Sequence, residues 1–248
     1  MNKIKILTLA FTATLMVACN SKPEQKTTEK TVAIEDEVKP LIQEVLTQER
    51  RDALTPDDVI KSFKEGNERF VNNDLTARDH SALVRKSATG QFPKAVVLSC
   101  LDSRVPVEDV FNRGIGDIFV GRIAGNFVNE DLLGSMEFGC KVAGSKLILV
   151  LGHEHCGAVK AAIDDVKLGN ITAMLSKIRP AVDKVVYEGD RTSKNKEFVD
   201  KVCVSNVLNT IEQIRLKSPI LKEMEDNGQI KIIGGVYNMD SGKVTFLD

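Results

Sequence analysis

Short, uniformly apolar runs alternate along the chain with longer segments in which apolar residues recur every three or four positions. The apolar runs lie at residues 94–99, 118–120 and 146–151, and such runs are typical of strands buried on both faces of a parallel sheet. A further run at 230–236, a turn at 240–242 and a second run at 244–247 predict a C-terminal hairpin.

The intervening segments have helical periodicity. Thr55, Pro56 and Asp57 provide the cap and first turn of one helix, and Asn129 provides the cap of another. The alternation of strands and helices predicts an α/β fold: a parallel central sheet flanked by helices, with a C-terminal antiparallel edge hairpin. The predicted helices cover residues 35–51, 55–73, 108–112, 129–142, 158–168, 172–186 and 196–216.

The first nineteen residues differ from the rest of the chain. Lys3 and Lys5 precede an apolar run at 6–18, which matches the core of a signal peptide and is shorter than the about 20 residues that cross a bilayer. Residues 15–19, Leu-Met-Val-Ala-Cys, resemble a bacterial lipobox, so Cys19 is the predicted lipidation site. An ordinary secretory signal followed by an unrelated cysteine is the alternative.

The polar segment after Cys19 has no apolar period and is typical of a tether. We therefore expect a signal peptide at 1–18, a lipid-anchored tether and helical arm at 19–54, and one catalytic domain at 55–248. The protein is predicted to face the periplasm or the cell surface. Asn20, in place of an aspartate after the lipidated cysteine, favours the outer membrane.

Charge and composition exclude some partners. The chain has 34 basic and 35 acidic residues, so no nucleic-acid partner is expected. Besides Cys19, four cysteines remain, and an even number in an exported protein permits disulfides. Cys140 and Cys203 lie in predicted helices, where we expect buried free thiols, with a disulfide between them as the alternative.

The other two cysteines and a histidine follow predicted strands. Cys100 comes after the first strand, and His153 and Cys156 come after the third. The carboxyl ends of parallel strands share one edge of a sheet, so these side chains can meet. Two thiolates and one imidazole leave one position open in a tetrahedral zinc site, as in catalytic sites. Taken alone, the His-x-x-Cys pair fits a core histidine near an unrelated cysteine better than a metal site.

The residues around these ligands form a specific set. It comprises Ser-Cys-Leu-Asp-Ser-Arg at 99–104, His-Glu-His-Cys-Gly at 153–157, Gly-Asn-Glu-Arg-Phe at 66–70, Gly-Asp-Ile-Phe at 116–119, Arg-Ile-Ala-Gly-Asn at 122–126 and Gly-Gly-Val-Tyr at 234–237. Together these segments strongly resemble the β-carbonic anhydrase family, over about residues 56–248.

The resemblance implies one zinc ion per chain, bound by Cys100, His153 and Cys156. It also implies that Asp102 and Arg104 form a catalytic pair beside the metal, in which the guanidinium keeps the carboxylate ionised. Family members with an aspartate-closed zinc site carry a second bicarbonate pocket that uses a tryptophan. This chain has no tryptophan, which favours the open form.

The activity implied is the reversible hydration of carbon dioxide to bicarbonate and a proton by hydroxide on the zinc. Gln91 and Phe119 occupy the positions of substrate-pocket residues that reach the zinc of a partner subunit, so a homodimer or homotetramer is expected. Two alternatives stay open: a carbonyl sulfide or carbon disulfide hydrolase on the same scaffold, and a non-catalytic zinc-binding lipoprotein. Metal storage needs neither the Asp102–Arg104 pair nor Gln91, which disfavours the last.

Overall fold

The computed structural model describes residues 41–247. The predicted signal peptide, the lipidation site Cys19, the tether and the first part of the predicted helix at 35–51 lie outside the described residues. Within the described residues no helix is both long enough and apolar enough to span a bilayer.

A five-stranded sheet forms the centre of the described region, with the strand order β2-β1-β3-β4-β5. The first four strands are parallel and the last pairs antiparallel to β4, which confirms the predicted fold class. The strands are β1 (Ala95–Ser99), β2 (Ile118–Arg122), β3 (Leu147–His153), β4 (Lys231–Tyr237) and β5 (Val244–Leu247).

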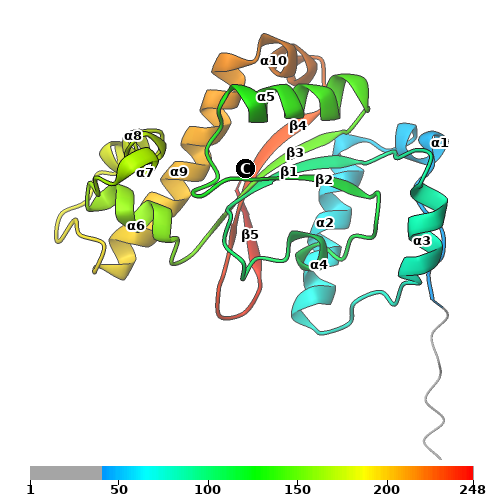
Figure 1. Cartoon of the computed structure of the whole chain (residues 1–248), viewed down its shortest axis with the longest axis horizontal. Coiled ribbons are helices and arrows are strands. Elements are labelled where there is room, and N and C mark those ends of the chain that lie inside the picture. The colour runs from blue at the N-terminus through cyan, green and yellow to red at the C-terminus, as the bar shows by residue number, and fades with distance from the viewer. Residues whose placement is uncertain (1–40, 248) are drawn as a thin grey trace, which may run out of the picture. The chain divides into compact units, whose positions relative to one another are not determined.

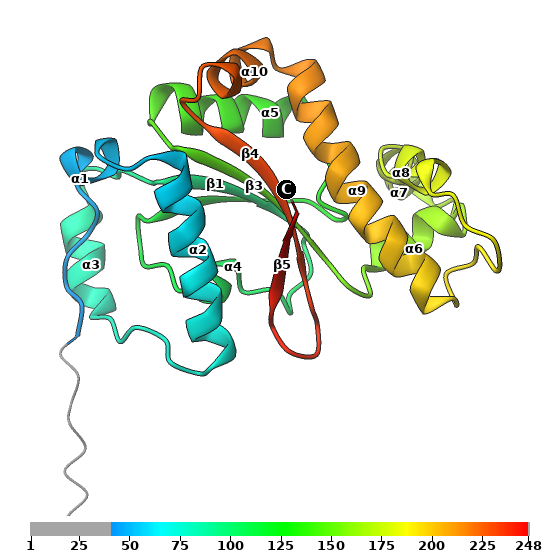
Figure 2. The same cartoon turned by 180° about the vertical axis from the view of Figure 1, so that it is seen from behind.

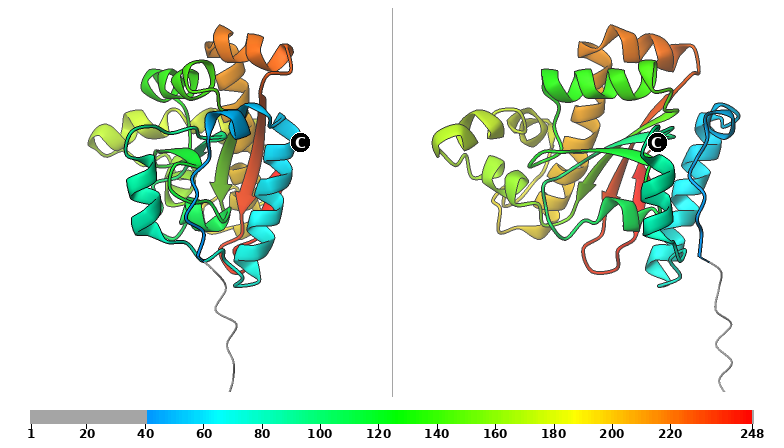
Figure 3. Two further views of the ribbon diagram at one scale, coloured as in Figure 1. Left: turned by 90° about the vertical axis from the view of Figure 1, so that its right-hand side faces the viewer. Right: turned by 45° about the vertical axis from the view of Figure 1, so that its right-hand side comes forward.

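Helices cover both faces of this sheet (Figures 1 and 2), and Figure 3 shows the layers from two further sides. They are α1 (Gln48–Asp52), α2 (Pro56–Val71), α3 (His80–Ser87), α4 (Val107–Val110), α5 (Glu130–Glu137), the π-helix η1 (Phe138–Val142), α6 (Gly157–Ile163), α7 (Gly169–Leu175), α8 (Arg179–Lys184), α9 (Lys196–Lys217) and α10 (Pro219–Asp226).

Alternate residues of each strand enter different cores. Val96 and Leu98 of β1 pack in the core formed with α5, α9 and α10. Ala95 and Val97 pack on the opposite face with α2 and α4. Because side chains alternate across a strand, burial on both faces requires the uninterrupted apolar sequence from which these strands were predicted.

A third cluster of buried residues lies beyond the carboxyl edge of the sheet. It joins α6, α7 and α8 to the first half of α9, and it includes Cys100 and Cys156. The loops that follow β1 and β3 therefore end in a packed apolar environment, which fixes the position of the predicted metal ligands.

Three helix predictions were wrong in extent. Of the described part of 35–51, only 48–51 is helical, as the start of α1, and Ile42 instead pairs with Arg78 in an isolated bridge. The segment 172–186 forms two helices, with Pro180 in the first turn of the second, where it cannot continue a preceding helix. The segment 158–168 is helical only to Ile163.

The structure also contains elements that the sequence pattern did not predict. Helix α3 begins after Asp79, whose carboxylate accepts a hydrogen bond from the Ala82 N–H at 2.9 Å. Helix α10 begins after Ser218 in the same way, with a bond from the Leu221 N–H. The helix predicted to run from Asn129 to 142 is capped by Asn129 but changes to a π-helix at Phe138.

Candidate metal centre

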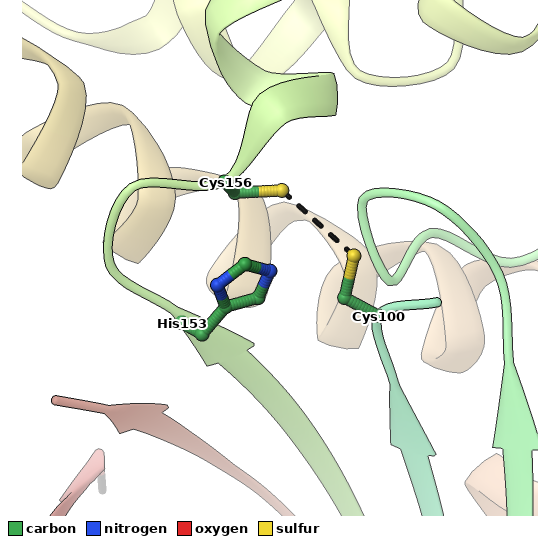
Figure 4. Close-up of side chains that lie close together, drawn as sticks. All are labelled: Cys100, His153 and Cys156. Atoms are coloured by element: carbon green, nitrogen blue, oxygen red, sulfur yellow. Dashed lines mark hydrogen bonds between the residues drawn. The ribbon is translucent and has the colours of Figure 1, made fainter. Parts of the chain in front are cut away.

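The ends of two adjacent strands bring the predicted metal ligands together. Cys100 directly follows β1, and Cys156 is the residue before α6. His153 is the last residue of β3 and does not lie past its end, because the strand continues two residues beyond the predicted end at 151. The nearest ligand atoms of the three residues all lie within 4.8 Å of one another, and the side chains converge as Figure 4 shows.

The donor atoms fit a tetrahedral zinc ion. The two sulfur atoms are 3.9 Å apart; Zn–S bonds of about 2.3 Å at a tetrahedral angle place two sulfurs about 3.8 Å apart. His153 is 1% exposed, and its Nε2 has no hydrogen-bond partner. Nδ1 lies 2.8 Å from the Glu154 carbonyl oxygen, to which it donates when protonated, leaving the Nε2 lone pair for a metal.

Local hydrogen bonds favour a thiolate at Cys100. The Cys156 thiol lowers the pKa of Cys100 most, and burial opposes this shift. The His153 side chain and then the backbone N–H of Gly125, at 3.3 Å, lower the pKa further, to well below its usual range. The same sulfur–sulfur contact, together with burial, raises the pKa of Cys156. A bound divalent cation removes this conflict, because it stabilises both thiolates at once.

Asp102 and Arg104 form the predicted pair at the rim of the cluster. The Arg104 Nε and one terminal nitrogen donate to the two Asp102 oxygens at 2.9 and 2.7 Å, and these bonds hold the pKa of the carboxyl well below its usual range. The Asp102 side chain is 16% exposed and that of Arg104 is 56% exposed. Asp102 Oδ2 also lies 3.8 Å from Nε2 of His153, so the carboxylate faces the metal position.

Arg122 fixes the backbone of the Cys100 loop, a role that the sequence did not reveal. One of its terminal nitrogens donates to the carbonyl oxygens of Cys100 and Asp102, both at 3.2 Å, and the other donates to that of Val105. The only sequence signal was the position of Arg122 within the Arg-Ile-Ala-Gly-Asn segment.

Gly125 is a second residue that supports Cys100 and whose role the sequence did not reveal. Its φ of +82° and a Cβ position only 2.4 Å from Ile178 Cδ1 make glycine necessary where its N–H meets the Cys100 sulfur. The Gly125 carbonyl accepts a bond at 2.8 Å from Asn206 in the middle of α9. No pattern in the sequence indicated this partner.

Glu154 ties the second ligand loop to the C-terminal hairpin. Its Oε2 accepts hydrogen bonds from Asn238 Nδ2 at 2.9 Å and from the Met239 N–H at 3.2 Å, and its own N–H donates to the Tyr237 carbonyl at 3.1 Å. Since the Glu154 carbonyl is also the partner of His153 Nδ1, these contacts fix the orientation of the imidazole.

The two predicted substrate-pocket residues lie away from the metal ligands of their own chain. Gln91 is exposed in the loop before β1. Phe119 pairs in register with Val96, four residues before Cys100, and β2 is a terminal strand of the described sheet. Phe119 lines a groove of about 690 Å³ between this edge and α5, and its ring meets Phe138 edge-on with centroids 6.4 Å apart.

Comparisons with known proteins agree with this geometry. The sequence model of the carbonic anhydrase family matches residues 95–244. Carbonic anhydrase 2 of Mycobacterium tuberculosis is 36% identical over 195 residues, covering 76% of this chain and 91% of that protein.

Solved structures of β-carbonic anhydrases are similar to this fold. A Coccomyxa β-carbonic anhydrase in complex with acetazolamide superimposes with a TM-score of 0.60 at 28% identity, covering 76% of this chain and 84% of that one. One of two tetrameric β-carbonic anhydrases from Sordaria macrospora shares the fold, with a TM-score of 0.59 at 23% identity, covering 67% and 86%.

Proposed function

This chain belongs to the carbonic anhydrase family, and on that premise we propose that it is a zinc-dependent enzyme that hydrates carbon dioxide reversibly to bicarbonate and a proton. The observation that carries this function is the buried cluster of Cys100, His153 and Cys156, with the carboxylate of Asp102 facing it. Three protein ligands leave a fourth position for the reactants, as catalytic zinc sites do.

The residues around the cluster supply the rest of the chemistry. Zinc, when bound, acidifies water and so provides a nucleophile at neutral pH. Asp102 faces the metal position, where its carboxylate would accept a hydrogen bond from a bound reactant and orient it. Arg104 keeps Asp102 ionised and therefore an acceptor. Arg122 prevents the loop that carries both Cys100 and Asp102 from shifting.

The substrate pocket is proposed to be completed by a second copy of the chain. Carbon dioxide is small and apolar, so an aromatic wall and one amide donor suffice. Phe119 and Gln91 offer these groups but lie away from the ligands of their own chain, and β2 presents an edge without a neighbour in the described sheet. We propose a homodimer or homotetramer in which each copy supplies these two residues to the other.

The amino-terminal sequence supports export and anchoring. We propose that the chain is cut before Cys19 and lipidated there, so that the enzyme faces the periplasm or the cell surface, with the outer membrane favoured by Asn20. Mass spectrometry of the mature amino-terminal peptide tests this proposal. A diacylated or triacylated Cys19 supports it, and an unmodified cysteine or an intact residue 1–18 segment contradicts it.

Stopped-flow hydration of carbon dioxide, with zinc counted in the same sample, tests the activity. The soluble form that starts after Cys19 should bind one zinc ion per chain and hydrate carbon dioxide. Cys100→Ser should lose both zinc and activity. Cys140→Ser is the matched control, because Cys140 is also a buried free thiol but lies in another core cluster.

Assays of the same zinc-counted samples distinguish carbon dioxide hydration from the two alternative functions. Full zinc occupancy without hydration at any pH contradicts the proposed function. Turnover of carbonyl sulfide or carbon disulfide by such a sample supports the sulfur-substrate hydrolase, and no turnover of either substrate class supports the non-catalytic zinc protein.

Subunit complementation tests the shared pocket. Cys100→Ser removes the metal site of one copy, and Gln91→Ala or Phe119→Ala removes the donated pocket residue of the other. Mixed dimers should regain one intact site, with up to half of the activity per dimer, whereas neither variant alone should be active. Failure of re-associated mixed dimers to regain activity contradicts donation between subunits.

A further inference from the structure

A cavity of about 180 Å³ lies at the opposite end of the sheet from the metal ligands, where β1 and β2 begin. Its walls come from segments 42–50, 76–83 and 114–117 and from Lys94. Ile42 donates to the Ala77 carbonyl at 2.9 Å and accepts from the Asp79 N–H at 3.0 Å, which fixes the amino-terminal wall. Figures 1 and 2 show α1 and α3 together on the side of the sheet away from α6, α7 and α8.

Lys94 provides a largely buried positive charge in this cavity. Its N–H donates to the Asp117 carbonyl at 2.9 Å and its carbonyl accepts from the Lys146 N–H at 2.8 Å, so its backbone is fixed between two strands. Among the described residues, its Nζ atom has no hydrogen-bond or ion-pair partner. Burial lowers the pKa of Lys94 most, Asp117 opposes this shift, and the guanidinium groups of Arg113, Arg50 and Arg78 lower the pKa further.

The charges around the cavity do not balance. Arg50, Arg78 and Lys94 line it, and the carboxylates that line it are Glu44 and Asp117. Glu44 is paired with Lys86, which is not part of the lining.

Among the lining residues, Asp117 is then the remaining carboxylate for three cations, and one of its oxygens already accepts the Gly114 N–H at 2.9 Å. Asp109, outside the lining, also acts on Arg78 but not on Lys94. Lys94 and Arg78 are partly removed from water, and Arg50 is exposed. Partly buried positive charge without a matching counter-charge is unfavourable, so an anion in the cavity would stabilise the structure.

We propose that this cavity binds a small oxyanion of the phosphate, sulfate or bicarbonate type. Its volume of about 180 Å³ is enough for such an ion. Lys94 provides a point charge inside, and Arg50 provides a second cation from an exposed position at the rim. The site is separate from the metal centre and does not depend on the proposed hydration activity.

Isothermal titration of the zinc-loaded protein with inorganic phosphate, at an ionic strength held constant with chloride, tests this proposal. Wild type should bind phosphate saturably, and Lys94→Met should bind it at least about ten-fold more weakly. Lys146→Met is the matched control: it removes the same charge at the same end of the sheet, outside the cavity lining, and should bind phosphate as wild type does.

Arg50→Gln provides a second test, because this exposed side chain can be changed without disturbing a core. It should weaken phosphate binding in the same direction while carbon dioxide hydration by the zinc-loaded enzyme is retained. Three results would overturn the proposal: no phosphate binding by wild type, equal binding by wild type and both cavity variants, or equal weakening by Lys146→Met, which would indicate a general charge effect.

Discussion

At the scale of single residues, the metal ligands are held by backbone groups and by one guanidinium. The Cys100 sulfur meets the Gly125 N–H, and the Cys100 carbonyl is held by Arg122. His153 is oriented through the Glu154 carbonyl. Such second-layer contacts fix the ligands before the metal binds, so changes in them should affect metal affinity or turnover without unfolding the protein.

Replacement of Arg104 by glutamine should reduce turnover while zinc is retained. Asp102 loses the bidentate partner that holds its oxygens in position, so kcat/KM should fall by about 10–100-fold with one zinc ion still bound. Stopped-flow assays and zinc analysis measure this. Unchanged kcat/KM in Arg104→Gln would show that the pair only shapes the loop.

The same substitution should change the response of stability to acid. A lowered carboxyl pKa stabilises the folded state above the unfolded-state pKa of about 3.9, and this contribution is lost as pH falls through the folded-state pKa. The free energy of unfolding, measured by denaturant unfolding at a series of pH values, should therefore fall less below about pH 4 in the variant than in wild type.

Replacement of Glu154 by leucine should weaken zinc binding. The carboxylate no longer accepts from Asn238 and Met239, and the carbonyl that orients His153 becomes free to move. We expect the zinc dissociation constant to rise by about 10–100-fold in competition with a chelator. Glu154→Gln keeps an accepting oxygen, so its zinc dissociation constant should stay near that of wild type. An equal rise of the dissociation constant in both variants would show that the charge of Glu154 matters and its hydrogen bonds do not.

At the scale of elements, α2 packs against both the end of α4 and the β4–β5 hairpin. Gly66 allows the helix to approach the backbone of Phe111, since a Cβ there would lie 2.0 Å from the Phe111 carbonyl oxygen. Asn67 donates to the carbonyls of Val110 and Gly242 and accepts from the Val244 N–H at 2.8 Å. This explains physically why glycine and asparagine stand together in the segment 66–70.

Substitution of Gly66 by alanine should destabilise the fold strongly. The added methyl group meets backbone that cannot move aside, and we expect the free energy of unfolding to fall by about 3 kcal/mol. Denaturant unfolding measures the change. Glu65→Ala, at the exposed neighbouring position on the same helix, should stay within about 0.5 kcal/mol of wild type. Equal stability of Gly66→Ala and wild type would show that α2 and α4 can separate without cost.

At the scale of the whole described region, the metal position joins units that are separate in sequence. Cys100 belongs to the end of β1, and His153 and Cys156 belong to the turn from β3 into α6. The cluster of α6, α7, α8 and α9 packs around two of these ligands. Metal binding should therefore stabilise the region that contains α6 to α9 relative to the sheet.

Removal of zinc by a chelator should lower the free energy of unfolding reversibly. The loss should be about 2.7 kcal/mol when free zinc had stood at about 100 times its dissociation constant. Calorimetry with and without chelator measures this, and added zinc should restore the original transition. Cys100→Ser protein should show no response to the chelator, and an unchanged transition in wild type would contradict a structural contribution of the metal.

The sequence by itself predicted the strands and their mostly parallel pairing, because strands buried on both faces need uniform apolar runs that lie within a few residues. The metal ligands were predicted from the resemblance of several separate segments to one family, and not from the His-x-x-Cys pair alone. Thr55 and Asn129 were recognised as caps from a local signal, because a cap bonds to a backbone group three residues away.

Only the tertiary structure decided which residues support those ligands. The contacts of Arg122 with Cys100, of Asn206 with Gly125 and of Asn238 with Glu154 join positions 22, 81 and 84 residues apart. Ile42 likewise pairs with Arg78, a residue from a distant segment, and is therefore not helical as predicted. Local periodicity carries no record of such pairings, because they arise only when packed elements bring the two backbones together.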